Sequence, residues 1–307
     1  MIFNSLGSNY DFGYVVKSLF SFSDGQKNLK HVLKNRFNGE VVLFYKGREA
    51  IEAALRISGL KKGEYVAING LTCYVVYKAV TNAGLKVEYL DIDQESLNFS
   101  SEILEKAIKR NSKIRAVIVQ NTLGYPCDIE NISAICKKNK LILIEDLAHS
   151  VGTTYHDGRS AGSYGDFVAL SFSQDKIIDA VSGGALIIRN PEFKKHFDFV
   201  PKNIPSMWYL KDRLYPKFTF VIRKTYALGL GKVFHYLLKK LHLLTVPVGK
   251  GEDVLHILPS WHSLLARNYI LDLDKDIKHR KKISVIYKEN IDPLFLSNKL
   301  LTNFDRS

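Results

Sequence analysis

Cysteine is scarce in this chain, and long apolar runs are absent. Cys73, Cys127 and Cys136 are the three cysteines among 307 residues. Their spacing matches no metal-ligand pattern, and an odd number of cysteines is typical of a reducing compartment. No run reaches the eighteen or so apolar residues that a membrane-spanning helix needs. These absences argue against a disulfide-stabilised secreted domain, a metal site built on cysteine and an integral membrane protein.

The first residues also lack the features of a secretory signal. Residues 1–10 contain neither a basic segment nor an apolar core. We therefore expect a cytoplasmic protein, with the inner face of the membrane as an alternative location. The chain is long enough for one large α/β domain and a partial second domain, and it shows no internal repeat.

Acidic residues are scarce in one segment in particular. The chain carries 44 Lys and Arg against 31 Asp and Glu, which gives a formal net charge of +13. Residues 201–250 contain ten Lys or Arg and a single acid, Asp212, so this segment carries +9 and the rest of the chain only +4. Because the excess is local, we do not expect nucleic acid as a partner.

Three interpretations of the basic segment 201–250 stay open. Apolar and basic residues are interspersed between residues 218 and 244, and Gly229 and Gly231 predict a break between two amphipathic helices. Such helices can lie on an anionic membrane surface. They can equally pack over the sheet or a dimer interface with solvated lysines, or attract the diphosphate of a nucleotide-linked sugar.

Strand-like and helical patterns alternate through the middle of the chain. Strands are predicted at 65–69, 85–90, 116–120 and 141–144, and helices at 49–58, 75–82, 101–109 and 129–138. Strands separated by helices predict an α/β fold with a mostly parallel sheet. Further helices are expected at 26–35 before this region and at about 260–273 and 276–287 after it.

Two strand-like runs end in residues that can carry out chemistry. Asp146 follows the apolar run 141–144, and Lys176 lies a few residues after the run 167–170. Open α/β sheets bind ligands at the carboxyl ends of their strands, and a desolvated lysine amine there attacks carbonyl carbon. Pyridoxal phosphate (PLP) needs such a pair, a lysine that holds its aldehyde as a Schiff base and a carboxylate that keeps its pyridine nitrogen protonated.

The chain resembles the DegT/DnrJ/EryC1/StrS family of PLP-dependent sugar aminotransferases, which have the fold-type-I architecture. The resemblance covers roughly half of the chain and rests on an ordered set of short motifs. These are GREAI at 47–51, LTC at 71–73, DID at 91–93, GYPCD at 124–128, EDLAHSVG at 145–152, GRSAGSYGD at 158–166, SFSQDK at 171–176 and GG at 183–184.

The resemblance implies roles for four residues around the cofactor. Lys176 matches the Schiff-base lysine, which also moves the proton, and Asp146 matches the partner of the pyridine nitrogen. His149 falls where the family has Gln or His near the cofactor's 3-oxygen. Ser171 falls on a serine that binds the cofactor phosphate.

Further roles are implied for the turn formed by Gly47, Arg48 and Glu49, and for Cys73. The turn matches a phosphate-binding turn at a helix start, where free N–H groups and the helix dipole favour an anion. Arg48 replaces a small hydroxyl residue, so it either pairs with the phosphate or points elsewhere. Cys73 replaces an aromatic residue that stacks on the cofactor ring, and Tyr74 is an alternative for that contact.

The activity implied by the resemblance is amino transfer from glutamate to the keto group of a nucleotide-activated sugar, in a homodimer that builds surface polysaccharide or a related glycan. Two alternatives stay open. One is a catalytically reduced or regulatory member of the family, with or without contact to a membrane surface. The other is a PLP-dependent sugar dehydratase, against which the retained Lys176 argues.

We expect four parts along the chain. A lead-in with one helix spans 1–46, the PLP-binding α/β domain spans 47–200, and a basic amphipathic helical segment spans 201–257. The last part, 258–307, is expected to be the start of a short or truncated C-terminal domain, because the family normally continues through a longer one.

Overall fold

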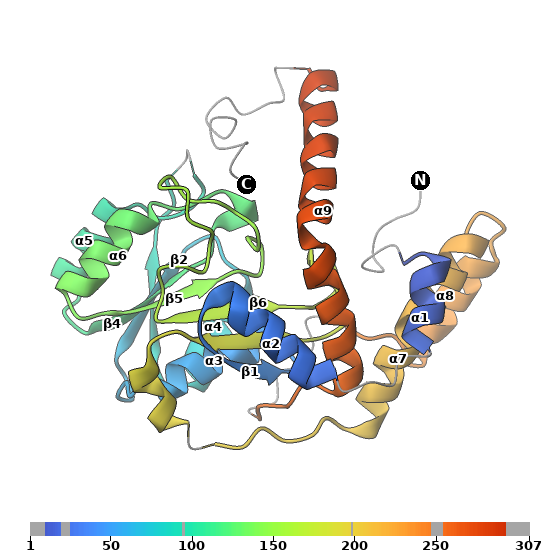
Figure 1. The fold of residues 1–307 in the computed structure, drawn as a ribbon, viewed down its shortest axis with the longest axis horizontal. Helices are drawn as coiled ribbons and strands as arrows, with labels where there is room; N and C mark the ends of the chain where they lie inside the picture. The colour runs from blue at the N-terminus through green and yellow to red at the C-terminus, as the bar shows by residue number, and fades with distance from the viewer. Residues whose placement is uncertain (1–9, 20–24, 94–95, 198, 247–253, 293–307) are drawn as a thin grey trace.

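Short apolar runs form the strands of a seven-stranded mixed sheet in the computed structural model of the chain (Figure 1). The structure describes residues 10–19, 25–93, 96–197, 199–246 and 254–292. The sheet has the spatial order β1-β7-β6-β5-β4-β2-β3. Its strands are β1 (Glu40–Phe44), β2 (Tyr65–Asn69), β3 (Lys86–Leu90), β4 (Ile114–Val119), β5 (Ile142–Asp146), β6 (Phe167–Ser171) and β7 (Gly184–Ile188).

The strands from β2 to β6 are parallel, and β7 pairs antiparallel with both β6 and β1. The central strands are buried almost throughout because helices cover both faces, which explains their continuous apolar runs. The predicted α/β class with a mostly parallel sheet is therefore confirmed.

Alternate residues of each strand contribute to two separate cores. On β4, Val117 and Val119 face one core, whereas Ala116 and Ile118 face the other. The first core is completed by α2 (Gly25–Phe37), α5 (Ser101–Arg110), α6 (Ile129–Lys138) and the first half of α9 (Ser260–Asn290). The second core is completed by α3 (Gly47–Ile57) and α4 (Tyr74–Asn82), so that α3 runs along the sheet with its N-terminus beside β6 and β7.

A helical hairpin lies to one side of the sheet. It consists of α7 (Ser206–Thr225) and α8 (Leu230–Lys240), with α1 (Phe12–Leu19) alongside α7 (Figure 1). Short 3-10 turns occupy Thr122–Gly124 and Pro191–His196. In the described ranges no helix combines the length and apolar character that crossing a membrane requires.

Strand β1 lies within the expected lead-in 1–46 and pairs with β7, so the sheet already starts before residue 47. The two helices expected between 218 and 244 are present as the end of α7 and as α8, and the helices expected from about 260 to 287 form the single helix α9. Residues 1–9 of the lead-in, 247–253 of the basic segment and 293–307 of the expected C-terminal part lie outside the described residues.

Candidate functional site

The carboxyl ends of β5 and β6 bring Asp146 and Ser171 to the same edge of the sheet. Asp146 is the last residue of β5 and lies opposite Ala169 of β6, two residues before Ser171. The N–H of Leu147 extends this pairing by donating to the carbonyl oxygen of Ala169 at 2.9 Å. The edge is therefore fixed by the backbone pairing of parallel neighbours, as the sequence predicts.

Asp146 is buried at this edge, with 7% of its surface exposed. Its Oδ1 accepts a hydrogen bond of 3.0 Å from the N–H of Ala148. Burial raises the pKa of Asp146 to about 6, even though the Ala148 hydrogen bond and the positive charge of Lys176 act in the opposite direction. A carboxylate in this setting is available to a positively charged partner such as a protonated ring nitrogen.

Lys176 lies in the turn after β6, close enough for its charge to act on both Asp146 and His149. The turn is tight, with Asp175 at a φ of 69° and the N–H of Lys176 donating to the carbonyl of Ser173 at 3.2 Å. Removal of water by neighbouring atoms lowers the pKa of His149, and the charge of Lys176 lowers it further. The structure thus brings together three of the residues that the sequence singles out.

Gly47 packs directly on Ser171 at the start of α3. A Cβ at Gly47 would lie 2.8 Å from the Cβ and 3.0 Å from the Oγ of Ser171, and a Cβ at Gly184 would lie 2.6 Å from the Cα of Gly47. Among the described residues no side chain caps the N-terminus of α3. Two glycines therefore allow a helix N-terminus to approach a serine hydroxyl, an arrangement suited to a phosphate group.

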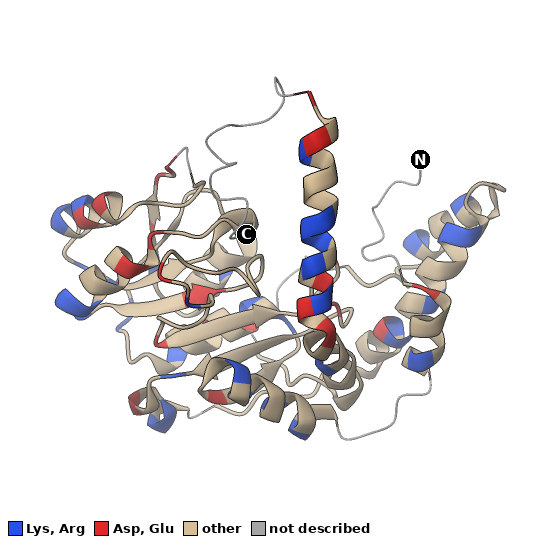
Figure 2. Cartoon of the chain, turned by 45° about the horizontal axis from the view of Figure 1, so that its top comes forward, with Lys and Arg blue, Asp and Glu red and all other residues tan. Residues whose placement is uncertain are grey.

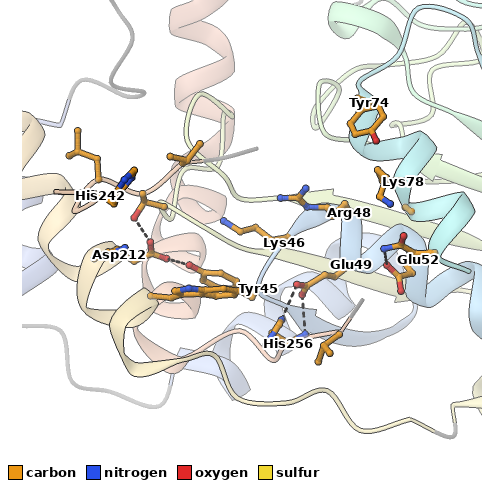
Figure 3. A pocket seen from close by; sticks show the side chains of 18 of the residues that line it. Tyr45, Lys46, Arg48, Glu49, Glu52, Tyr74, Lys78, Asp212, His242 and His256 are labelled. Atoms are coloured by element: carbon orange, nitrogen blue, oxygen red, sulfur yellow. Dashed lines mark hydrogen bonds and ion pairs between the residues drawn. The ribbon is translucent and has the colours of Figure 1, made fainter. Parts of the chain in front are cut away.

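Arg48 and Glu49 point away from this contact. Arg48 points into a neighbouring cavity (Figure 3). The Glu49 carboxylate lies 3.3 Å from the His256 ring Nδ1 and accepts the His256 N–H at 3.2 Å, while the N–H of Glu49 donates to the carbonyl of Lys46 at 3.1 Å. The side chain of Glu49 therefore joins α3 to the segment after residue 253.

Cys73 is exposed at the N-cap position of α4. The adjacent Tyr74 stacks on Tyr77, with ring centroids 5.6 Å apart, and lines the cavity rather than the edge beside Asp146. The loop that carries Cys73 is held by Gln120 after β4, which accepts from Thr72 Oγ1 at 2.5 Å. The structure places Cys73 at the expected edge and turns Tyr74 elsewhere.

Glu145, next to Asp146, points to the opposite side of the strand and organises the following loop. It is fully buried and accepts four hydrogen bonds of 2.6 to 2.7 Å. The donors are the backbone N–H groups of Gly162, Tyr164 and Gly165 and the hydroxyl of Tyr155. Neighbouring carboxylates in one strand thus have different roles because successive side chains alternate between faces.

A cavity of about 1190 Å³ opens beside the start of α3 (Figure 3). It lies between α3 and α4 on one side and α7, α8 and residues 242–246 on the other. Six cationic side chains line it: Lys46, Arg48, Lys78, Lys211, Lys239 and Lys240. The described lining residues include neither Asp146 nor Lys176, so the cavity adjoins the strand-end site without containing it.

Lys46 connects the cavity with the strand-end site and is a residue that the sequence analysis missed. Its Nζ donates to Ser182 Oγ at 3.0 Å, and burial lowers its pKa. Ser182 follows Val181, whose positive φ of 68° is held by the buried Asp179, which accepts the Val181 N–H at 2.8 Å. Lys46 follows the apolar strand β1, the same signal that identified Lys176.

Asp212, which the sequence marks only as the single acid of segment 201–250, is a second residue that was not assigned to a site. It is fully buried at the base of the cavity and accepts hydrogen bonds from the hydroxyls of Tyr45 at 2.8 Å and Thr245 at 2.6 Å. His262 Nε2 lies 2.7 Å from Asp212 Oδ2. Burial alone would raise the pKa of Asp212, but His262, Lys46 and Thr245 together lower it.

A comparison with protein families finds one match over most of the α/β region. The sequence model of the DegT/DnrJ/EryC1/StrS aminotransferase family matches residues 31–202, which is more than half of the chain. The matched range contains every residue assigned above to the strand-end site.

Curated relatives align over the same region. A pleiotropic regulatory protein of Geobacillus stearothermophilus is 32% identical over 146 residues, which are 48% of this chain and 38% of the relative. A GDP-perosamine synthase of Vibrio cholerae is 30% identical over 141 residues, 46% of this chain and 38% of the relative. The aligned region of this chain thus spans little more than a third of these proteins.

Solved structures show the same fold over a longer stretch. The aminotransferase TlmJ from Streptoalloteichus hindustanus superposes with a TM-score of 0.67 at 18% identity, covering 94% of this chain and 71% of the other. At this level of identity the similarity concerns the fold.

Proposed function

Because this chain belongs to the DegT/DnrJ/EryC1/StrS aminotransferase family, we propose that it transfers an amino group from glutamate to the keto group of a nucleotide-linked sugar. Aminotransferases of this family depend on PLP. The observation that carries the proposal is the position of the buried Asp146 and of Lys176 at one sheet edge, with the charge of Lys176 acting on Asp146.

The residues at this edge fit PLP in both charge and space. The N-terminus of α3 and the Ser171 hydroxyl, brought together by Gly47, would hold the phosphate. Asp146 would bind the protonated ring nitrogen, which compensates the cost of ionising a buried carboxyl. His149 would lie near the 3-oxygen, and Cys73 at the rim of the ring. Among the three residues of the turn, Arg48 and Glu49 would contribute backbone rather than side chains.

PLP supplies an aldehyde that condenses with amines and a ring that withdraws electrons from the carbon being deprotonated. The protein's part is to position groups and to move protons. The Lys176 amine would accept a proton from the substrate carbon and return it to the cofactor carbon. Asp146 would keep the ring nitrogen protonated, because its carboxyl is ionised above its pKa of about 6.

The nucleotide-linked substrate is supported by the name of the Vibrio cholerae relative and by the cavity next to Lys46. Six cations against three carboxylates, Glu49, Glu52 and Asp212, leave the cavity lining with an excess of three positive charges, which favours an anionic group such as a diphosphate. The proposal includes a homodimer, since the resemblance implies active sites shared between two subunits. Glutamate as the donor follows from the same resemblance.

Visible absorption of the purified protein with added PLP tests the cofactor site. We expect an absorption band that borohydride bleaches, with the reduced cofactor attached to Lys176 in a peptide map. Lys176→Ala should lose the band, whereas Lys113→Ala, at an exposed lysine far along the sheet, should keep it. A wild type that stays colourless in excess PLP, or an unchanged band in Lys176→Ala, contradicts the proposal.

Release of 2-oxoglutarate from glutamate tests the amino transfer itself. The PLP-loaded protein should release one equivalent of 2-oxoglutarate without any sugar, and a nucleotide-linked keto-sugar should make the release catalytic. Sedimentation equilibrium should show a dimer under the same conditions. A protein that binds PLP at Lys176 but releases no 2-oxoglutarate would instead support the regulatory alternative.

A further inference from the structure

The outer face of α8 is a continuous apolar stripe exposed to solvent. Leu230, Val233, Leu237 and Leu241 are spaced by three, four and four residues, so they lie on one side of the helix. Their exposed fractions are 65%, 60%, 46% and 63%, and Leu228 at the hairpin tip is 75% exposed. We call these five residues the α8 face. An amphipathic helix normally turns such a stripe inward.

The hairpin already has an inner core, so the α8 face is not needed for packing against α7. Ile222 of α7 and Leu238 of α8 are buried between the helices. Gly231 brings the backbones close together, since a Cβ there would lie 2.2 Å from the carbonyl oxygen of Ile222. The stripe is thus a second apolar surface on a helix whose first one is already covered.

Lys and Arg residues recur along the hairpin that carries the α8 face (Figure 2). Residues 206–246 contain eight Lys or Arg and one acid, Asp212, which is buried in its hydrogen-bond network. Lys224 and Lys232 are exposed on either side of the hairpin tip. The exposed surface of the hairpin therefore carries cations without any carboxylate.

We propose that the α8 face docks on an anionic phospholipid surface, with its leucines and valine at the boundary of headgroups and acyl chains and the lysines on lipid phosphates. A helix with an apolar stripe and a lysine-rich polar side is the usual form of a surface-lying membrane helix. A neighbouring side of α8, with Tyr236, Lys239 and Lys240, lines the cavity of about 1190 Å³. Docking would therefore place that cavity next to the membrane surface.

Charge argues for lipid rather than a second copy of the chain as the occupant. A twofold contact would bring the same surface patch of two copies together, and thus lysines against lysines, because α7 and α8 carry no exposed acid that could pair with them. An anionic bilayer offers a negative charge for each lysine and an apolar layer for the stripe. The proposed homodimer would use other surfaces.

Sedimentation of the full chain with vesicles tests the docking. The protein should sediment with phosphatidylserine-containing vesicles, remain in solution with pure phosphatidylcholine, and dissociate as salt rises from about 0.1 M to about 1 M, where the screening length falls from about 10 to about 3 Å. Replacing Lys224 and Lys232 together by Gln should weaken partitioning by about fivefold for each lysine. The matched double variant at Lys106 and Lys109, exposed on α5, should change it little.

The contribution of the apolar stripe to vesicle binding is tested by comparing Val233→Glu with Leu271→Glu. Leu271 is a similarly exposed apolar residue on α9. The first variant should abolish sedimentation and the second should retain it. Equal effects of these two variants, or no wild-type binding at low salt, would overturn the proposal. So would a change from dimer to monomer in Val233→Glu, which would assign the face to a second copy. None of these readouts depends on PLP or on amino transfer, so the two proposals fail separately.

Discussion

The hydroxyl of Tyr45 donates a hydrogen bond of 2.8 Å to Asp212, a residue 167 positions away. Tyr45 follows β1 and immediately precedes Lys46 and the start of α3, whereas Asp212 belongs to α7. The bond therefore joins the edge of the sheet to the helical hairpin at the base of the cavity. It thus helps to fix the position of the hairpin relative to the strand-end site.

Tyr45→Phe should lower the free energy of unfolding by about 1.5–3 kcal/mol, because it removes a hydrogen bond to a buried charge. Urea denaturation at neutral pH measures this change. Tyr287→Phe, at an exposed tyrosine on α9, should remain within about 0.5 kcal/mol of wild type. Equal stabilities of the two variants would mean that Asp212 finds another donor or that the bond contributes nothing.

Asp146→Asn should stabilise the protein without cofactor. The folded-state pKa of Asp146 is raised from 3.8 to about 6, so its favourable contribution is complete below pH 3.8 and is lost as the pH rises through 6. At pH 7.5 the variant should exceed wild type by about 3 kcal/mol, and by about half of that at pH 5. Denaturant unfolding at both pH values measures the difference.

Added PLP should make wild type more stable than Asp146→Asn, because only wild type has a carboxylate that can pair with the protonated ring nitrogen. Asp274→Asn, at an exposed carboxylate, serves as the control and should shift stability by less than about 0.5 kcal/mol. A variant at Asp146 that is less stable than wild type without cofactor at pH 7.5 would show that the carboxylate is stabilised by contacts other than those described.

Lys176→Met should raise the pKa of His149. Loss of water around the ring lowers this pKa first, and the positive charge of Lys176 lowers it further, so removing the charge removes the second effect. Titration of the imidazole by NMR measures the shift directly and needs no cofactor. Lys113→Met should leave His149 unchanged, and the same result for Lys176→Met would place Lys176 away from the histidine.

Gly47→Ala should destabilise the protein by about 1–3 kcal/mol and weaken PLP binding, because the new methyl group collides with Ser171. Ser171→Gly in the same chain should recover part of the lost stability by removing the atoms that collide, though not the hydroxyl contact to the phosphate. Gly13→Ala in α1, where the nearest atom would be the side-chain Oδ1 of Asp11 at 3.3 Å, should cause a much smaller loss. Additive effects at Gly47 and Ser171 would contradict a direct contact.

Local sequence patterns were sufficient for most of the sheet but not for its antiparallel edge. Buried parallel strands appear in the sequence as apolar runs. In the helices between them, apolar residues recur every three or four positions, so both kinds of element could be predicted. Strand β1 was missed although it contains the apolar run of Val41, Val42 and Leu43. Its role depends on pairing with β7, more than 140 residues later, and an apolar run does not specify its partner or direction.

The same distinction applies to the candidate site. Asp146 and Ser171 end strands and Lys176 follows one, so their shared edge could be inferred from the order of the elements. Asp212 stands out as the single acid of segment 201–250, but its contacts are with residues that are distant in the sequence, so no local pattern predicts its place in the cavity. The roles of the predicted cofactor residues stay predictions until the cofactor experiments are done.

Helix α9 is one element with two very different surroundings. All of its buried residues fall between Trp261 and Leu273, whereas Asp274 to Asn290 extends beyond them as a partly or fully exposed rod, visible as the upper half of α9 in Figure 1. The first half is held by tertiary packing, and the second mainly by the hydrogen bonds of the helix itself. Amide hydrogens should therefore exchange at least in two stages, with those after residue 277 lost long before those around Leu265. Exchange in the exposed half of this one helix would then measure local opening, and exchange in its buried half would measure global unfolding.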